Sequence, residues 1–408
     1  MRKTSEKLLF IFTLALSGAL NLLSWTLPGF SDRFTDYVFP VLTSPYARLT
    51  SLFPFSVGEL LIIAGLIWLA VLAVFLTAGF ILRFSRTFSK RRAGRGSVSP
   101  GPAGPASEEN AGRTVKFSHI RFSFYRATAW LLALILLIMT LNCFVLYHCT
   151  PLERTLPGAG KSYTLEDLTQ LRDALVVRTN EMAEAMERGE DGEVYRDEEA
   201  LREEAREIVA GLSALGYPRF LHFTPRPKGL TFSNFMAQQY MEGYYFPFSM
   251  EANYNTVMKF MNKPSAICHE LAHTHGYIYE DEANFLSYLS CTSSSDPVFV
   301  YSGLLLVLYY VDNDFYAAVG KNEYRKHPAI SSLVRSDNEF LTDEAWNKVE
   351  ETAVLDTETV KKAADTFVDT TLKVNGVRAG KISYSHVVRL LLSYYDGDLS
   401  WFREGGQR

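Results

Sequence analysis

Three long stretches of apolar residues dominate the first third of the chain. Residues 8–27, 60–82 and 127–147 each contain about 20 residues and no charged one. A helix of ~20 residues crosses the ~30 Å hydrocarbon layer of a bilayer, so the pattern predicts three transmembrane helices. A buried core helix would explain any single stretch but not three of them. The first stretch could be a signal peptide, but its length and the lack of a small-x-small cleavage site favour an uncleaved anchor.

The rest of the chain has shorter apolar runs at helical spacing. Residues 165–188 and 197–215 alternate apolar and charged positions, which predicts two amphipathic helices packed as a pair. Residues 343–372 predict one or two more such helices, and residues 387–392 a final one. The apolar run 297–311 is short for a membrane span, so we expect a buried core helix there.

One aromatic stretch interrupts this helical pattern. Residues 241–255 are typical of a short extended strand, and Pro247 restricts that strand to the edge of a sheet. An edge strand can accept a peptide as an additional strand, so the stretch could bind a substrate; its aromatic residues could equally belong to the core. The predicted fold is therefore mainly α: three N-terminal transmembrane helices and a mostly helical α+β domain with a short edge strand.

Charge divides the chain near residue 149. Residues 1–149 carry 15 Lys and Arg against 6 Asp and Glu, whereas residues 150–408 carry 26 against 39. Residues 84–122 are basic and rich in Pro and Gly at their centre, which predicts a disordered linker. Because loops rich in Lys and Arg stay in the cytoplasm, we expect the amino terminus and this linker to be cytoplasmic. Residues 1–149 would then form a three-span anchor in the cell membrane, and residues 150–408 an extracytoplasmic domain.

The basic linker does not require a nucleic-acid partner. Anionic lipid headgroups beside a membrane anchor account for such a charge excess. We therefore expect a lipid bilayer as a partner and no nucleic acid. The four cysteines show no CxxC spacing, so a structural zinc knuckle is excluded. Cys149, Cys268 and Cys291 could form a disulfide in an extracytoplasmic domain or remain buried thiols.

The strongest chemical signal is the string from His269 to His273, which reads His-Glu-Leu-Ala-His. Two histidines four residues apart stand on one face of a helix, where both imidazoles can bind a single Zn²⁺. Glu270 lies beside the first histidine and can accept a proton from a metal-activated water as a general base. The string therefore predicts a zinc site with hydrolytic chemistry.

A second helix is predicted to complete this site. Gly276 can end the first helix, and an apolar run that begins after Glu280 reads as another. Glu280 and Asn284 are again four residues apart, so the carboxylate can reach the metal while the amide orients a histidine ligand. Glu282 is the rival third ligand, because Glu280 and Glu282 point to different helical faces.

A hydrolase of this kind also needs a donor for the oxyanion of the tetrahedral intermediate. Tyr384 and His386, near the start of the last predicted helix, are candidates for that role. Their residue types and positions fit ordinary capping and core roles as well. The sequence alone leaves both interpretations open.

These motifs resemble those of the gluzincin branch of the HExxH metallopeptidases, whose second helix carries a Glu-x-x-x-Asp or Glu-x-x-Ala-Asp/Asn signature. The resemblance implies a zincin-like domain in which Glu280 is the third zinc ligand and Asn284 a partner of the ligands. The whole chain is similar to the uncharacterised bacterial membrane zincins called domain of unknown function 3810. The similarity rests on residues 243–248, 269–273, 280–285, 371–376 and 383–384.

The function that we expect is a membrane-anchored, zinc-dependent endopeptidase acting on a peptide or protein substrate. One alternative is a non-catalytic cell-surface module, for binding or sensing, that zinc merely stabilises. Another is a protease that cleaves within the membrane or faces the cytoplasm, which would require inverted topology. A fourth protein ligand to the metal would favour the structural module, whereas an open coordination position on the metal would favour the enzyme.

Overall fold

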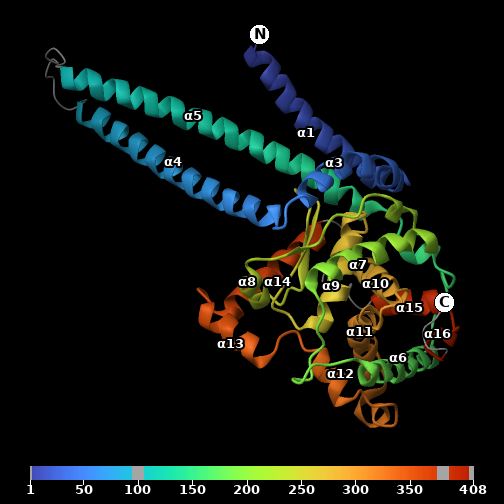
Figure 1. The fold of residues 1–408 in the computed structure, drawn as a ribbon. Helices are drawn as coiled ribbons and strands as arrows, with labels where there is room; N and C mark the ends of the chain where they lie inside the picture. Colours follow the sequence, from blue (N-terminus) through green and yellow to red (C-terminus); the bar gives the residue numbers. More distant parts are fainter. Residues whose placement is uncertain (1, 94–104, 375–385, 404–408) are drawn as a thin grey trace. The chain divides into compact units, whose positions relative to one another are not determined.

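The computed structural model describes residues 2–93, 105–374 and 386–403 (Figure 1). The chain forms two compact units. The first contains residues 1–19 and 59–138, and the second contains residues 20–58 and 139–408. Most described residues are helical, and one small sheet lies in the second unit.

The first unit consists of long apolar helices: most of α1 (Arg2–Thr26), α4 (Val57–Ala93) and α5 (Pro105–Met139). Polar contacts join α4 to α5. Trp68 Nε1 donates to Thr128 Oγ1 at 3.1 Å, and the Tyr125 hydroxyl donates to the Phe75 carbonyl at 2.9 Å. Many apolar side chains remain exposed, as in the most apolar part of α4, where none is buried. Several helices near the amino terminus are therefore long and apolar enough to span a membrane.

The segment predicted as a disordered linker, residues 84–122, is helical at both of its ends. The helix α4 continues through Ala93, and α5 begins at Pro105. The reason lies in local propensity: residues 83–93 contain no Pro or Gly, and residues 105–122 begin with Pro and two early glutamates, which favour a helix start. The low-complexity centre, residues 94–104, lies outside the described residues.

The core of the second unit is built on three helices, α9 (Lys263–Thr274), α10 (Glu280–Thr292) and α11 (Pro297–Tyr324), which lie together in Figure 1. The helices α10 and α11 approach closely at Gly303, where an added Cβ would lie 2.7 Å from Cys291 Cβ. The predicted core helix at residues 297–311 is buried but longer than expected. It too is apolar enough to span a membrane, yet 67% of its apolar window is buried within the protein.

The helices predicted at 165–188 and 197–215 are α6 (Leu165–Ala185) and α7 (Glu198–Gly211). They do not form the expected pair, because α6 packs mainly against α11 and α7 mainly against α9. The other α-helices described in this unit are α2 (Phe30–Arg33), α3 (Phe39–Ser51), α8 (Ser233–Gln238), α12 (Ser332–Asp337), α13 (Asp343–Thr352), α14 (Thr357–Val374), α15 (His386–Tyr395) and α16 (Ser400–Arg403).

The sheet has three short strands in the order β1-β3-β2. The strand predicted at 241–255 is a hairpin of β2 (Gly243–Phe246) and β3 (Glu251–Tyr254), and β1 (Lys228–Gly229) pairs in parallel with β3. The chain turns after Pro247, with Met250 in the left-handed region at φ 54°. As predicted, the strand before Pro247 lies at an edge.

A buried carboxylate on β3 holds the start of α4. Glu251 accepts hydrogen bonds from the backbone N–H groups of Val57 and Gly58, at 3.1 and 2.8 Å. Lys228 Nζ lies 4.0 Å away, and burial lowers the pKa of Lys228 to about 8. A negative charge at a helix start pairs with unsatisfied N–H groups, so this contact ties the first turn of α4 to the sheet.

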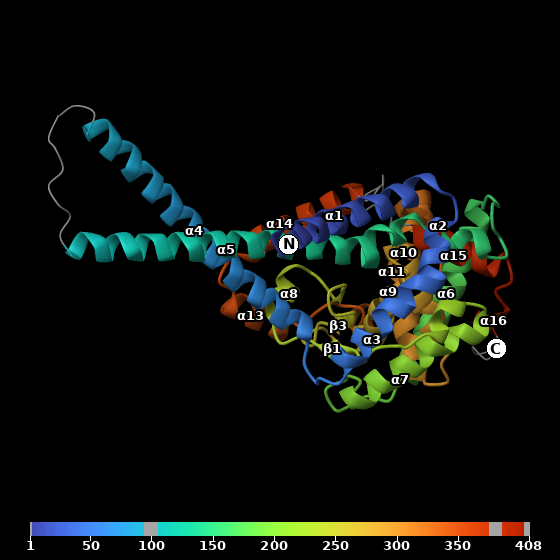
Figure 2. The ribbon, with the colours of Figure 1, turned by 90° about the horizontal axis from the view of Figure 1, so that it is seen from above.

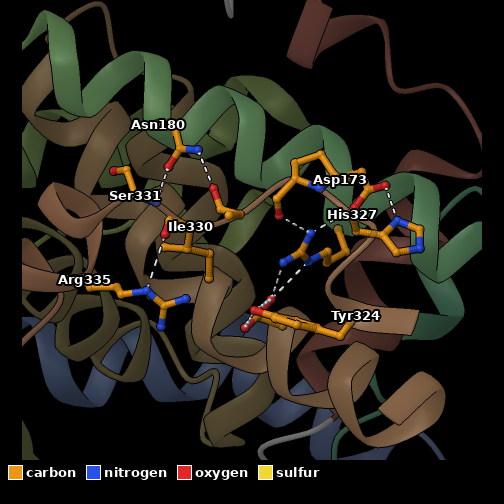
Figure 3. Close-up of polar contacts among 11 residues, drawn as sticks. Asp173, Asn180, Tyr324, His327, Ile330, Ser331 and Arg335 are labelled. Atoms are coloured by element: carbon orange, nitrogen blue, oxygen red, sulfur yellow. Dashed lines mark hydrogen bonds and ion pairs between the residues drawn. The ribbon is translucent and has the colours of Figure 1, made fainter. Parts of the chain in front are cut away.

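A second polar cluster joins α6 to α11 (Figure 3). The fully buried guanidinium of Arg172 donates to Asp312 through Nε and Nη2, at 3.0 and 2.9 Å. The hydroxyl of Tyr324 donates to Asp312, and His327 Nδ1 lies 2.7 Å from Asp173. Figure 3 also shows Asn180 of α6, which donates to the Ala329 carbonyl and accepts from the Ser331 N–H in the loop between α11 and α12. Because Asp312 of α11 pairs with a buried arginine of α6, α11 packs within the domain as a core helix does.

Replacing Arg172 by Ala should destabilise the second unit. Asp312 would remain largely buried without its cationic partner, and breaking such a pair costs about 3–5 kcal/mol. Thermal unfolding of the purified protein measures the effect. Lys326→Ala is the control: Lys326 forms an exposed pair with Glu323, worth about 0–1 kcal/mol. Equal shifts in both variants would contradict a stabilising role for Arg172.

Candidate metal centre

The two helices that carry the sequence motif are joined by a tight turn. The helix α9 ends at Thr274, and Gly276 follows in the left-handed region at φ 87°. Glycine adopts this conformation at little cost, and an added Cβ would lie 2.6 Å from Thr35 Cγ2. The chain can therefore reverse within a few residues, and α10 begins at Glu280. The short link between the histidines and Glu280 is enough to bring them to one place.

The side chains of His269, His273 and Glu280 converge. The Nε2 atoms of the two histidines lie 3.1 Å apart, and Glu280 Oε2 lies 3.1 Å from His269 Nε2 and 3.7 Å from His273 Nε2. Two imidazoles and a carboxylate form the donor set of many catalytic metal sites. Among the described residues, these three form a group that could hold a metal ion.

Hydrogen bonds at the far side of each ring fix this arrangement. The Nδ1 atom of His269 lies 2.8 Å from Asn284 Oδ1, and that of His273 lies 2.7 Å from the Tyr277 carbonyl. Both acceptors require a proton on Nδ1, which leaves the Nε2 lone pairs free to face Glu280. The residues therefore fit a metal ion in both donor type and orientation.

Glu270 lies beside this group with one oxygen unsatisfied. The side chain is buried, and its Oε2 has no hydrogen-bond partner among the described residues. Burial raises the pKa of Glu270 to about 7. A buried polar oxygen without a partner costs free energy, so this oxygen is available to accept a hydrogen bond from a molecule bound in the site.

The charges of the three converging side chains support one another. Burial opposes the charged form of Glu280, but the two histidines outweigh it and hold the pKa of Glu280 below its ordinary value. Burial likewise opposes protonation of His269, and the contact with Glu280 outweighs it and raises the pKa to about 9. A positive charge is therefore favoured at the point where the three side chains meet.

The group lies in a cleft of about 760 Å³. Its walls include β2, the end of α8 and the segment between them, α14, and two tyrosines of α11, Tyr309 and Tyr310. Glu242 adds a carboxyl group beside the histidines, and burial raises its pKa. We did not predict Glu242, Tyr309 or Tyr310 from the sequence. None of the three belongs to the histidine motif or to the helix that follows it. Only knowledge of which distant segments are in contact could have placed them in the cleft.

The third predicted transmembrane stretch also contributes to the cleft. Met139, Cys143 and Tyr147 line it, and all three belong to the second unit. The candidate span that contains them runs through His119–His148. The end of an apolar helix therefore forms part of the same cavity as the converging histidines.

The other predicted site residues lie elsewhere. Glu282, the rival third ligand, is buried and accepts a hydrogen bond from the Leu152 backbone N–H at 2.6 Å. His386 is 57% exposed, and its nearest acidic partner, Asp281, lies 3.9 Å away. Tyr384 lies outside the described residues. Of Glu280 and Glu282, Glu280 is thus the one that the structure brings to the histidines.

The cysteines form no disulfide. Cys143, Cys149, Cys268 and Cys291 are all buried free thiols. Cys268 immediately precedes His269 but is not part of the converging group. Its thiol faces the core, where it interacts with Cys291.

Gly243 of β2 allows the strand to approach Glu270. An added Cβ would lie 2.5 Å from the Asn253 carbonyl oxygen and 2.8 Å from Glu270 Cγ. Gly243→Ala should therefore displace β2 or Glu270 and cost about 1–3 kcal/mol of unfolding free energy. Gly211→Ala is the matched control, because nothing lies within 4 Å of its added Cβ. Thermal unfolding compares the two, and an unchanged midpoint in Gly243→Ala would contradict the close approach.

Comparison with known proteins gives one match. No curated protein and no solved structure matches the chain. A family model described as a protein of unknown function (DUF3810) matches residues 109–392, which is more than two thirds of the sequence and includes the whole candidate metal centre. The chain therefore belongs to DUF3810, a family of proteins of unknown function.

Proposed function

We propose that this protein is a membrane-anchored, zinc-dependent endopeptidase of the gluzincin-like type. The observation that carries the proposal is the convergence of His269, His273 and Glu280 beside the unsatisfied oxygen of Glu270, within an open cleft. Three apolar stretches would anchor the chain in the cell membrane. The distribution of Lys and Arg favours an extracytoplasmic catalytic domain.

Zn²⁺ is the metal that this donor set suits best. His269, His273 and Glu280 would hold it, and it would then supply Lewis acidity and lower the pKa of a water molecule. Among the described residues, no fourth histidine, cysteine or acidic side chain joins the group. Three protein ligands with an open position are typical of catalytic rather than structural zinc sites. This difference favours the enzyme over a module that zinc merely stabilises.

Glu270 would act as the general base and then as the general acid. Its carboxylate accepts a proton from the attacking water and later delivers that proton to the leaving amine nitrogen. A pKa near 7 suits both steps, because the group can take up and release a proton near neutral pH. Asn284 and the Tyr277 carbonyl would keep the imidazoles oriented through Nδ1.

The edge strand β2 would bind the substrate. It lines the cleft and pairs on one side with β3, so a peptide can add to its other side as a further strand. Tyr309 and Tyr310 line the same cleft. Their hydroxyl groups are better placed than His386 to donate a hydrogen bond to the oxyanion of the tetrahedral intermediate.

Glu270→Gln should abolish peptide hydrolysis while zinc stays bound. Glutamine keeps the shape of the side chain but cannot accept the proton, and loss of a general base costs at least ~100-fold in rate. Digestion of a peptide library by the full-length protein measures turnover, and metal analysis of the same sample measures zinc. Equal cleavage by Glu270→Gln and the unchanged protein would rule out this mechanism.

Glu280→Gln and Glu282→Gln form a matched pair for the third ligand. Glu280→Gln should lower zinc affinity by at least ~10-fold, because a neutral amide replaces the anionic ligand. Glu282→Gln should bind zinc normally, since its amide oxygen can still accept the Leu152 N–H bond. Competitive titration with a zinc chelator measures both affinities. The reverse order would assign the third ligand to Glu282.

A further inference from the structure

The segment of residues 30–55 joins two helices that are apolar enough to cross a membrane. The first candidate span is Thr4–Thr26, and the second is Val57–Ile81. The joining segment contains α2 and α3 and belongs to the second unit. Two consecutive spans enter and leave a bilayer on the same side, so both ends of this segment lie at one membrane surface.

One face of the segment packs on the domain that carries the metal centre. Phe34, Phe39 and Ala47 are buried in a cluster with residues including Leu146 and Ile278. The hydroxyl of Thr50 donates to the Ser249 carbonyl at 2.9 Å. Figure 2 shows α2 and α3 in front of α9 and α10. The segment is therefore a fixed part of the domain and not a loose connection.

The opposite face is exposed and apolar. Val41 is 71% exposed and Leu52 is 75% exposed. The other exposed large apolar residues of the segment are Tyr37, Val38, Leu42, Leu49, Phe53 and Phe55. Within α3 the exposed positions recur at the spacing of one helical face, opposite Phe39, Thr43 and Ala47. An exposed apolar patch of this size marks an interaction surface.

The exposed face carries one charge. Residues 34–56 contain two charged side chains, Asp36 and Arg48. Arg219 Nε donates to half-buried Asp36 at 2.8 Å. Arg48 is exposed on the same face as Val41 and Leu52, and its guanidinium lies 4.2 Å from the centre of the Phe223 ring. A single arginine among apolar side chains suits the headgroup region of a bilayer, because its long side chain can carry the charge to water or phosphate.

We infer that this exposed face of residues 37–55 lies in the interface of the lipid bilayer. The covalent connection to a candidate span at each end selects lipid over a soluble partner, because both ends already lie at the membrane surface. An amphipathic helix with one largely apolar face binds there by burying that face among the headgroups and acyl chains. A second copy of the chain would have to displace lipid from the same position.

The same geometry specifies the substrate of the proposed endopeptidase. The cleft is lined by Met139, Cys143 and Tyr147 near the end of another candidate span, and β2 touches the start of α4 where Phe246 packs against Gly58. A cleft lined by the last residues of one candidate span is tied by the chain to the bilayer, so we expect a substrate to reach it near the membrane surface. Its substrate is a polypeptide cleaved close to its own membrane anchor.

Site-directed spin labelling of the full-length protein in lipid nanodiscs tests the surface. The native cysteines are buried, so a label reacts selectively at an introduced exposed cysteine. Val41→Cys and Leu49→Cys report on the apolar face, and Val354→Cys, at a position that is 95% exposed, is the aqueous control. We expect the first two labels to be several-fold less accessible to a water-soluble nickel complex than the control, and more accessible to oxygen.

Two outcomes would overturn the lipid contact. Nickel accessibility at Val41→Cys equal to that at Val354→Cys would mean that the face is in water. Protection that disappears when each nanodisc holds a single chain would mean that a second copy covers it. Neither measurement depends on catalysis, so each stands whether or not the protein is a peptidase.

A spacer series tests the substrate class, which rests on the proposed function. A library-selected cleavable peptide is attached to a transmembrane anchor through spacers of ~5 or ~30 residues, the shorter reaching at most ~17 Å. We expect the short-spacer substrate to be cleaved at least as fast as the long one. Tenfold faster cleavage of the long one would place the cleft away from the bilayer and overturn the inference. Absence of cleavage of any peptide would instead refute the proposed function and, with it, this substrate class.

Discussion

The structure depends on holding two imidazoles and a carboxylate close together in a largely buried place, with the nearest atoms of each pair 3.1 to 3.7 Å apart. Such a group is stable only if each ring is oriented from behind and the helices approach closely. Asn284 and the Tyr277 carbonyl orient the rings, and the turn at Gly276 allows α10 to return beside α9. The packing of α11 against both helices then fixes their spacing.

The spacing of the motif was enough to predict the position of its two histidines. Residues four apart in a helix share a face whatever the fold, so His269 and His273 could be placed together from the sequence. The residues near the motif could not decide whether Glu280 or Glu282 is the third ligand. It depends on the rotation of α10, which is set partly by the hydrogen bond between Glu282 and the distant Leu152 backbone. No sequence pattern records that contact.

The cleft was harder to foresee than the metal centre. Its walls come from segments that lie far apart in the sequence, including those of Cys143, Gly243 and Tyr309. The aromatic stretch indicated an edge strand correctly, but the hairpin with β3 required the turn after Pro247. The pairing predicted for the two amphipathic helices failed because α11, longer than its apolar run suggested, offers α6 a larger partner surface.

The four buried thiols have a consequence for how this protein matures. Small exported domains often depend on oxidative folding, in which disulfides replace a core that is too small. Here Cys268 and Cys291 sit in the centre of a large hydrophobic core, and neither is cross-linked. The second unit, which contains all four thiols, can therefore reach its native state without an oxidoreductase. Its stability is then the same in reducing and oxidising surroundings.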